Sequence, residues 1–305
     1  MSGAIGSSGY DSECGIKLGI TESKKYKDSA PLFAVVKNMI TINGKFFNID
    51  FNKRFGQNFI LDRNLLSAIA ADAGVTGEDV VVEIGAGAGT LTAALAAVAK
   101  EVIAYEIDEN LRPVLSETLA GLTNVRVVYE DYTKRTEPLP ARFKVVANLP
   151  YYVTTPIIMS LIEGEDRPET ITVMVQKEVA ERLVAAPGTS DYGAITASLG
   201  LVADAEITRI VGRQNFIPPP NVDSAVVKIT LRDKGYTAEE ISAARKLIRA
   251  AFNMRRKTLS NALAGVVGGK DRAAALIAAC GFLPTVRGET LSAADFVTLV
   301  RKAQA

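Results

Sequence analysis

The sequence predicts an α/β fold with a largely parallel sheet, followed by a small all-helical region. Between residues 62 and 185, short apolar runs alternate with segments of helical periodicity. This alternation is typical of a parallel sheet covered by helices on both faces. A glycine-rich turn after the first apolar run joins a strand to a helix, as in folds that bind nucleotides. After residue 233 the helical periodicity continues without a strand-like run.

The individual elements follow from periodicity and from the residues that flank each run. Strands are expected at residues 80–84, 101–106, 125–129, 143–147 and 170–175, and two later ones at 205–211 and 224–231. Helices are expected at residues 64–73, 90–98, 109–120, 156–163, 177–185, 238–263, 272–279 and 293–303. We therefore predict a main domain over residues 51–233 and a helical domain over residues 234–305.

Residues 1–50 form an N-terminal extension whose role the sequence does not reveal. The first 30 or so are rich in glycine, serine and lysine, which is typical of a disordered leader. Within residues 35–51, β-branched and aromatic residues flank Asn43-Gly44, a turn signal that predicts a short hairpin.

The composition excludes several kinds of chemistry. The chain has 305 residues, a net charge of +1 and no histidine. Serine and cysteine hydrolases that need an imidazole base are therefore excluded, and we expect no metal site. Its two cysteines form no metal-binding spacing, which suits a reducing cytoplasm. We expect a cytoplasmic protein without a membrane span, and a monomer.

The turn at residues 83–90, EIGAGAGT, predicts a nucleotide or nucleoside site. Glu106 ends the next predicted strand, where a carboxylate can accept hydrogen bonds from both ribose hydroxyls. Glu83 would repel a pyrophosphate but suits a cationic ligand, which favours S-adenosylmethionine over a dinucleotide. Asp131 follows the third strand and can bind the adenine amine, although an ordinary helix N-cap is the alternative.

The fourth strand runs directly into Asn148-Leu149-Pro150-Tyr151. The exocyclic nitrogen of adenine is a poor nucleophile because its lone pair is conjugated into the ring. The Asn148 side-chain oxygen and the Leu149 carbonyl can accept hydrogen bonds from that amine, while Pro150 restricts the backbone and Tyr151 can stack on a base turned out of its helix. An ordinary turn is the alternative interpretation for these four residues alone.

With these motifs the sequence resembles the ribosomal RNA small-subunit adenine dimethyltransferase family, whose bacterial members are known as KsgA. The resemblance covers about residues 53–300 and rests on segments 54–59 (RFGQNF), 83–87 (EIGAG), 148–151 (NLPY), 175–183 (VQKEVAERL), 218–226 (PPPNVDSAV) and 255–258 (RRKT). It implies a Rossmann-like methyltransferase domain, a helical C-terminal domain, and dimethylation of two adjacent adenosines near the 3′ end of 16S rRNA.

The resemblance also implies specific site residues. Catalysis would rest on Asn148, Leu149, Pro150 and Tyr151. S-adenosylmethionine would contact Asn58, Ile60, Gly85, Glu106, Asp131 and Asn148. The chain departs from the family pattern at Ala86, where proline is frequent, and at Tyr152, where asparagine is frequent. The second departure places the target-base pocket in question.

A basic run lies between residues 245 and 257, which contain no acidic residue. Such a run can neutralise RNA phosphates, although a solvated helix face is the common alternative. We predict RNA contacts from Arg249, Arg255, Arg256 and Lys257. The expected partner is the small ribosomal subunit, with an additional role in its assembly.

Three other functions remain open at this point. An Erm-type methyltransferase would modify 23S rRNA instead. A ribosome-assembly or transcription factor could use the same fold without catalysis, although intact Asn148 and Glu106 argue for an enzyme. A nicotinamide-dependent oxidoreductase is the most distant alternative.

Overall fold

The computed structural model describes residues 39–42, 45–48, 58–150, 153–164 and 166–304. The expected leader therefore lies outside the described residues, as do Tyr151 and Tyr152. Strands β1 (Met39–Ile42) and β2 (Lys45–Asn48) pair in antiparallel fashion, which confirms the hairpin predicted around Asn43-Gly44. The turn itself is outside the described part.

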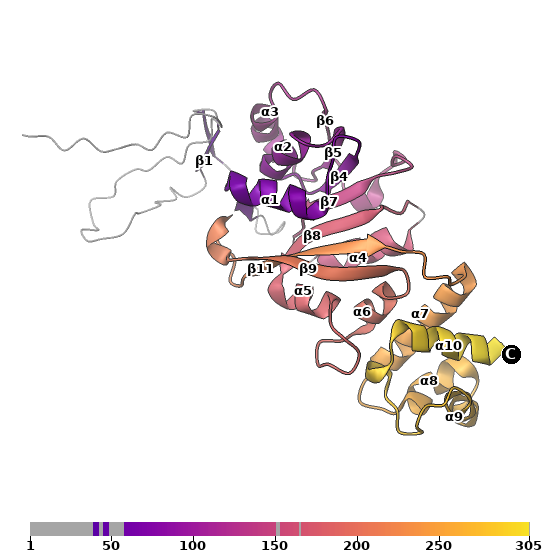
Figure 1. Cartoon of the computed structure of the whole chain (residues 1–305). Coiled ribbons are helices and arrows are strands. Elements are labelled where there is room, and N and C mark those ends of the chain that lie inside the picture. The colour runs from indigo at the N-terminus through magenta and orange to yellow at the C-terminus, as the bar shows by residue number, and fades with distance from the viewer. Residues whose placement is uncertain (1–38, 43–44, 49–57, 151–152, 165, 305) are drawn as a thin grey trace, which may run out of the picture.

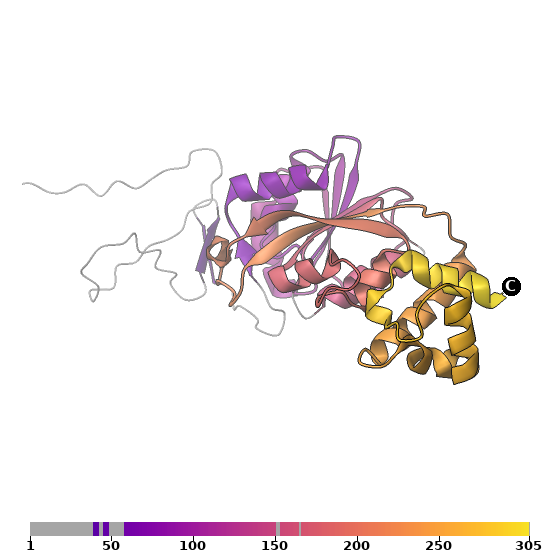
Figure 2. The same cartoon turned by 60° about the horizontal axis from the view of Figure 1, so that its bottom comes forward.

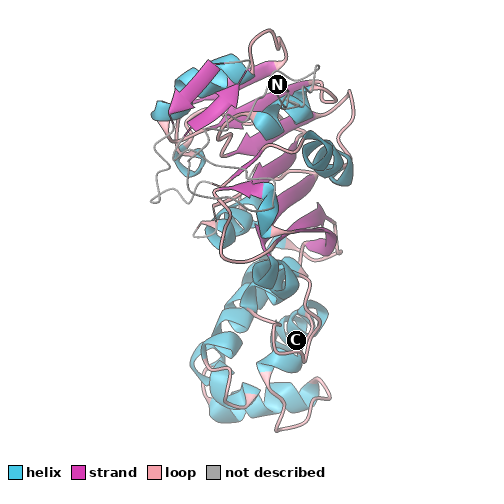
Figure 3. Cartoon of the chain, turned by 90° about the vertical axis from the view of Figure 1, so that its left-hand side faces the viewer, coloured by secondary structure: helices cyan, strands magenta, loops and turns pink. Residues whose placement is uncertain are grey.

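A seven-stranded sheet forms the centre of the protein, in the order β6-β5-β4-β7-β8-β11-β9 (Figures 1 and 3). Its first five strands are parallel, and β11 pairs in antiparallel fashion with both β8 and β9. The strands are β4 (Val80–Ile84), β5 (Glu101–Tyr105), β6 (Val125–Val128), β7 (Lys144–Asn148), β8 (Thr170–Gln176), β9 (Ala203–Val211) and β11 (Ser224–Leu231).

Helices cover both faces of this sheet, because alternate strand residues point to opposite sides. Val81 and Val146 belong to a buried cluster with the helices that follow β3, β4 and β5. Their neighbours Val82 and Val145 belong to a second cluster on the other face. One face carries α1 (Arg63–Ala73), α2 (Thr90–Ala96) and α3 (Arg112–Thr118), and the other carries α4 (Thr154–Glu163), α5 (Lys177–Leu183) and α6 (Ala194–Leu199).

Sheet order reverses at β4, whose two neighbours are β5 and β7. The chain adds β5 and β6 on one side and then returns to add β7 and β8 on the other. In open α/β sheets such a reversal leaves a crevice at the carboxyl ends of the strands, where ligands bind. The Rossmann-like fold predicted from the alternating pattern is confirmed.

The described elements after β11 are all helical: α7 (Ala238–Asn253), α8 (Leu259–Val267), α9 (Lys270–Ala279), the 3-10 turn η5 (Gly288–Thr290) and α10 (Ala293–Gln304). The prediction of one helix over residues 238–263 was wrong, because the chain leaves the helix at Met254 and restarts after Thr258. Hydrogen bonds to a distant segment explain the break. Leu259 N donates to the Val286 carbonyl at 2.7 Å, and the Arg287 side-chain Nη2 donates to the Arg255 carbonyl at 2.8 Å.

The sequence also did not predict several short elements. These are α6, β3 (Phe59–Ile60), β10 (Phe216–Ile217) and the 3-10 turns η3 (Tyr132–Lys134) and η4 (Arg213–Asn215), whereas the 3-10 turn η2 (Glu109–Leu111) lies within the helix expected at residues 109–120. β3 and β10 form an antiparallel pair of two residues each. Such short segments show too little periodicity to be recognised, and tertiary contacts decide their conformation.

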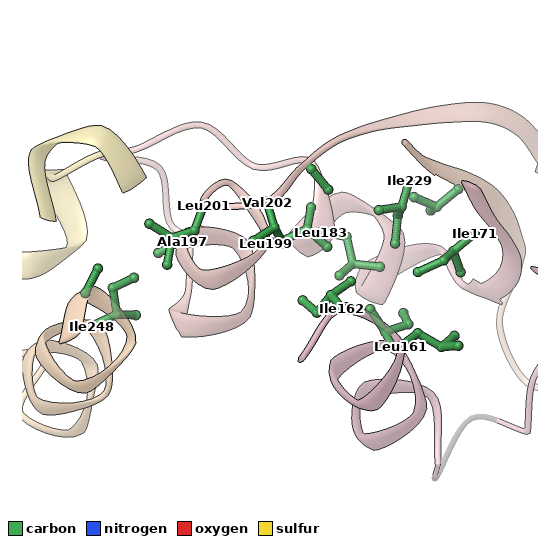
Figure 4. Packing of buried hydrophobic residues seen from close by; sticks show 14 of the residues in the cluster. Leu161, Ile162, Ile171, Leu183, Ala197, Leu199, Leu201, Val202, Ile229 and Ile248 are labelled. Carbon is green, nitrogen blue, oxygen red and sulfur yellow. The ribbon is translucent and has the colours of Figure 1, made fainter. Parts of the chain in front are cut away.

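One hydrophobic cluster continues from the sheet into the C-terminal helices. Figure 4 shows Ile248 of α7 facing Ala197 of α6 and Leu201, with Leu199 and Val202 farther along the same cluster. The C-terminal helices pack against this end of the α/β region in both Figures 1 and 2. Of the described helices, none has the length and apolar character that a membrane span requires.

Because the core is continuous, we predict that Ile248→Ala destabilises the α/β region and the C-terminal helices together. Ile248 is fully buried, so its truncation should lower the free energy of unfolding by about 2–5 kcal/mol. Chemical denaturation followed by far-UV circular dichroism and tyrosine fluorescence should show one shifted transition. Val266→Ala, at a half-exposed position, is the control and should change little. Two separate transitions with only one shifted would contradict this prediction.

Candidate active site

A cavity opens at the carboxyl edge of the sheet, where β4, β5 and β7 end. Parallel pairing brings the residues that follow these strands to one place. The lining includes predicted site residues from four separate segments of the chain: Asn58, Ile60, Gly85, Glu106, Asn148, Leu149 and Pro150. The cavity therefore lies at the reversal of strand order.

The glycine-rich turn forms one wall of the active-site cavity. Gly85, Gly87 and Gly89 all have positive φ, of 83°, 58° and 79°, which side chains rarely tolerate. A Cβ on Gly87 would lie 3.0 Å from the Phe59 ring. The glycines thus permit both the turn and the close approach of the segment that packs over it.

Glu106 holds the glycine turn against β5. Its Oε2 accepts from the Gly87 N–H at 2.7 Å and its Oε1 accepts from the Asp108 N–H at 2.8 Å. Burial raises the pKa of the Glu106 carboxyl, and these two backbone donors oppose that effect. Each carboxylate oxygen still has a second lone pair, so the side chain can also accept hydrogen bonds from a ligand.

Glu83 is an almost completely buried carboxyl beneath the same turn. Its Oε2 has no hydrogen-bond partner among the described residues, and the side chain lines the cavity. Burial raises the pKa of Glu83 to about 8, and the nearby Glu106 carboxylate contributes to the shift. With this pKa Glu83 is mostly protonated at neutral pH in the ligand-free protein, and a cationic ligand in the cavity would favour its ionised form. The two acidic side chains therefore suit a cationic ligand better than a pyrophosphate.

The segment Asn58–Ile60 is held over the cavity by two side chains from other elements. Asn148 Nδ2 donates to the Asn58 carbonyl at 2.9 Å, and Thr90 Oγ1 donates to the Ile60 carbonyl at 2.7 Å. Phe59 and Ile60 are buried and pair with β10. The segment thereby connects the glycine turn, β7 and β10, the strand that precedes the prolines at residues 218–220.

The first of these bonds also orients the Asn148 side chain. A backbone carbonyl only accepts hydrogen bonds, so the Asn148 amide nitrogen must face Asn58. The Asn148 Oδ1 is then turned away from Asn58, and Asn148 is one of the residues that line the cavity. The role that the sequence motif predicts for this oxygen, as an acceptor toward an amine, stays a prediction.

The rest of the motif is held from both sides. Leu149 is buried, and its N–H donates to the Met174 carbonyl of β8 at 3.3 Å. The Pro150 carbonyl accepts from Val153 N at 3.1 Å and from Thr154 Oγ1 at 3.2 Å, at the start of α4. The predicted roles of Tyr151 and Tyr152 concern positions outside the described residues.

Asp131 stands apart from the other predicted cofactor residues. It caps η3, where its Oδ1 accepts from Thr133 N at 2.9 Å and from Thr133 Oγ1 at 2.7 Å. It does not line the active-site cavity. The N-cap alternative therefore describes its present contacts, and its role toward adenine stays a prediction.

In the folded protein, acidic residues from other segments lie beside part of the basic run. Arg249 lies 3.6 Å from Glu163, and Arg255 lies 2.9 Å from Glu289. For Arg256 and Lys257, both exposed, the described residues supply no carboxylate within ion-pairing distance. The three residues 255–257 lie on the connection between α7 and α8 instead of on a helix face.

Other cavity residues were missed by sequence reasoning. Thr90 anchors Ile60, Phe59 packs on Gly87, and Ile107 lies half-exposed at the cavity. Ile107 could have been found, because an apolar residue directly follows the acidic end of β5. The pairing of Thr90 with a segment 30 residues earlier had no signal in the sequence.

Comparison with known proteins assigns the chain to a family. The family model described as "Ribosomal RNA adenine dimethylase" matches residues 48–304. The chain belongs to this family. It is 42% identical over 266 residues to "Ribosomal RNA small subunit methyltransferase A" of Geobacillus thermodenitrificans, with 83% of this chain and 91% of that protein covered. A protein of the same name from Clostridioides difficile is 43% identical over 263 residues, with the same coverage.

Solved structures agree with this assignment. A dimethyladenosine transferase from Plasmodium falciparum superposes with a TM-score of 0.71 at 27% identity, covering 80% of this chain and 96% of that one. The 23S rRNA methyltransferase ErmE superposes with a TM-score of 0.66, also at 27% identity, covering 81% of this chain and all of that one. The predicted family, fold class and enzyme class are confirmed.

The family uses S-adenosylmethionine, and the cavity residues fit this cofactor. An unpartnered buried carboxyl oxygen on Glu83 suits a ligand that carries a sulfonium and an ammonium group. A cradle of three positive-φ glycines admits a ligand close to the backbone. In the part of the chain that the structure describes, no group of three acidic or cysteine side chains could hold a metal ion.

We predict that Glu83→Gln weakens S-adenosylmethionine binding by about tenfold or more, because an amide cannot neutralise a cation. The same change should stabilise the ligand-free protein at alkaline pH. The raised pKa means that folding favours the protonated carboxyl, so this stabilisation is complete below pH 4.5 and is lost as the pH rises toward 8. Glu83→Gln should abolish that loss.

Titration calorimetry measures the binding effect, and thermal unfolding at pH 5 and pH 8 measures the stability effect. Glu78→Gln is the matched control, since Glu78 is exposed at the opposite end of β4. Equal pH dependence of unfolding in wild type and Glu83→Gln would rule out a raised pKa at this position.

Proposed function

We propose that this enzyme transfers two methyl groups to the N6 atom of each of two adjacent adenosines near the 3′ end of 16S rRNA. The observation that carries the proposal is the Asn148 amide, held by the Asn58 carbonyl with its oxygen available to an amine. The names of the curated relatives support the small subunit as the substrate. A role in small-subunit assembly accompanies the reaction.

The proposed chemistry is activation of a weak nitrogen nucleophile. S-adenosylmethionine supplies an electrophilic methyl group on a sulfonium. Asn148 Oδ1 and the Leu149 carbonyl accept hydrogen bonds from the adenine amine, which favours a pyramidal nitrogen whose lone pair points at the methyl group. Pro150 limits the backbone freedom of Leu149. Attack would form the nitrogen–methyl bond as the methyl–sulfur bond breaks, leaving S-adenosylhomocysteine and a positively charged amine. That amine is acidic enough to lose its proton to water, so a strong base is unnecessary and the absence of histidine does not hinder the reaction.

We assign cofactor contacts to the residues that the family resemblance implies. Asn58, Ile60, Gly85, Glu106 and Asn148 line one cavity. Glu106 would bind the ribose hydroxyls through its remaining lone pairs, and Asp131 would bind the adenine amine after a change in its capping contacts. Tyr151 is assigned to stacking on the target base. Glu83 joins this set as the counterion of the cationic cofactor.

The alternative functions are less well supported. The curated relatives with 41–43% identity are named for the small subunit, whereas the ErmE structure shares 27% identity. A purely non-catalytic factor would not need an oriented Asn148 amide or a buried, unpartnered Glu83 carboxyl. We further propose that the protein is a cytoplasmic monomer.

The basic run is proposed to contact the RNA backbone without reading its sequence. Arg256 and Lys257 are the strongest candidates, because both are exposed and lie outside the ion pairs formed by Arg249 and Arg255. Arg249 and Arg255 would add positive charge beside them. Together these residues extend the substrate surface onto the C-terminal helices.

We predict that the purified enzyme transfers labelled methyl groups to unmodified 30S particles and not to 50S particles or DNA. Mass spectrometry of digested rRNA should show dimethylation of two neighbouring adenosines. Asn148→Ala should lower transfer by about a hundredfold or more while cofactor binding stays measurable, because it removes an acceptor that the reacting amine needs. A preference for 50S particles would reject the proposed substrate, and unchanged turnover in Asn148→Ala would reject its role.

A second prediction concerns the basic run. Replacing both Arg256 and Lys257 by glutamine should weaken binding to 30S particles. It should also reduce the slope of log K against log salt concentration by about one to two, as expected for the loss of one or two phosphate contacts. The matched control replaces Lys100 and Arg142, which are exposed at the amino edge of the sheet, far from the site. A salt slope equal in both double variants would remove this run from the interface.

A further inference from the structure

A second cavity, of about 490 Å³, lies between α5, the loop before α6 and the end of α7. We call it the α5–α7 cavity. Its volume falls within the range of small-ligand sites. It is lined in part by Thr155, Arg182, Asp191, Tyr192, Phe252 and Arg255. None of these residues belongs to the active-site cavity or has been assigned a function by the family resemblance except Arg255.

In sequence, the lining of the α5–α7 cavity begins at Thr155, shortly after the catalytic motif. Pro150 lines the active-site cavity, and its carbonyl accepts from Val153 N and Thr154 Oγ1. Thr155, the next residue of α4, lines the α5–α7 cavity. The start of α4 therefore connects the linings of the two cavities along the chain. An RNA strand whose reacting nucleotide enters the active-site cavity can place a neighbouring nucleotide at the α5–α7 cavity.

The lining of this cavity has the composition of a nucleotide site. Phe252 is half-buried, and its ring packs edge-on against Tyr192, with ring centroids 5.8 Å apart. Tyr192 is buried and its hydroxyl donates to the Leu291 carbonyl at 2.9 Å, which ties the aromatic pair to the C-terminal helices. Aromatic rings held in this way offer a stacking surface to a base.

The rim supplies charge of both signs. Arg182 Nη2 lies 3.1 Å from the exposed Glu178, and Arg255 lies 2.9 Å from Glu289. Glu289 also faces Arg287 at 3.2 Å, so one carboxylate is shared by two guanidinium groups there. The exposed Asp191 carboxylate can accept hydrogen bonds from amino groups on a base. Both arginines keep donors for a phosphate after their present contacts.

From this geometry we propose that the α5–α7 cavity binds the nucleotide adjacent to the adenosine being methylated. Its base stacks on Phe252, and its phosphate faces Arg182 and Arg255. The inference rests on the proposed function, because it places a neighbouring nucleotide of the same RNA strand. The RNA strand would then be held at both cavities while the target base leaves its stack.

Steady-state methylation of unmodified 30S particles tests the inference. Phe252→Leu and Arg182→Gln should each lower kcat/KM for particles by about tenfold, the effect expected for loss of one stacked base or one phosphate contact. The loss should appear in KM, with kcat and the affinity for S-adenosylmethionine unchanged. Phe252→Tyr, which keeps the ring, should restore wild-type kcat/KM. Arg182→Gln should also flatten the salt dependence of particle binding.

Matched controls separate this effect from a loss of stability. Phe282→Leu removes another half-buried ring of the C-terminal region, and Arg142→Gln removes an exposed arginine at the opposite edge of the sheet. Both should leave kcat/KM within about twofold of wild type. Values that close to wild type in Phe252→Leu and Arg182→Gln would overturn the inference while the proposed function stands. Absence of transfer by the wild-type enzyme would overturn the proposed function, and the inference with it.

Discussion

Strand β4 is hydrogen-bonded in parallel to β5 on one side and to β7 on the other, and the active site depends on this pairing. Parallel strands in register end at the same edge of a sheet. Gly85, Glu106 and Asn148 each lie at or just beyond the carboxyl end of one of these strands, so residues far apart in the sequence meet at one cavity. An antiparallel neighbour would have carried one of them to the opposite edge.

Two hydrogen bonds then fix the orientation of polar groups at this cavity. Glu106 holds the glycine turn through Gly87, and Asn148 holds the covering segment through Asn58. Each bond also fixes which atoms remain for a ligand. In the proposed function, the acidic side chains of Glu83 and Glu106 favour a positively charged cofactor, and the Asn148 oxygen accepts from an N–H donor of the substrate.

The C-terminal helices share a hydrophobic core with the sheet. Their core is continuous with the cluster on the α4–α6 face, and Arg255 donates to the Ser190 carbonyl at 2.6 Å across the junction. This junction builds the α5–α7 cavity beside the catalytic motif. The shared core and this hydrogen bond connect the helices to the part of the protein that carries the motif.

The seven strands of the central sheet, the helices α1 to α5, the glycine turn, the proposed catalytic motif and the family could all be predicted from the sequence. These features are local, since each depends on periodicity or on adjacent residue types. Tertiary structure decided the rest. It broke the helix predicted over residues 238–263, because backbone groups near Arg255 and Leu259 bond to residues 286–287. It also gave partners to Arg249 and Arg255 from distant acids, oriented the Asn148 amide through Asn58, and left the buried Glu83 Oε2 without a hydrogen-bond partner among the described residues. Contacts between residues far apart in the chain leave no periodic pattern in the sequence, so only the folded structure reveals them.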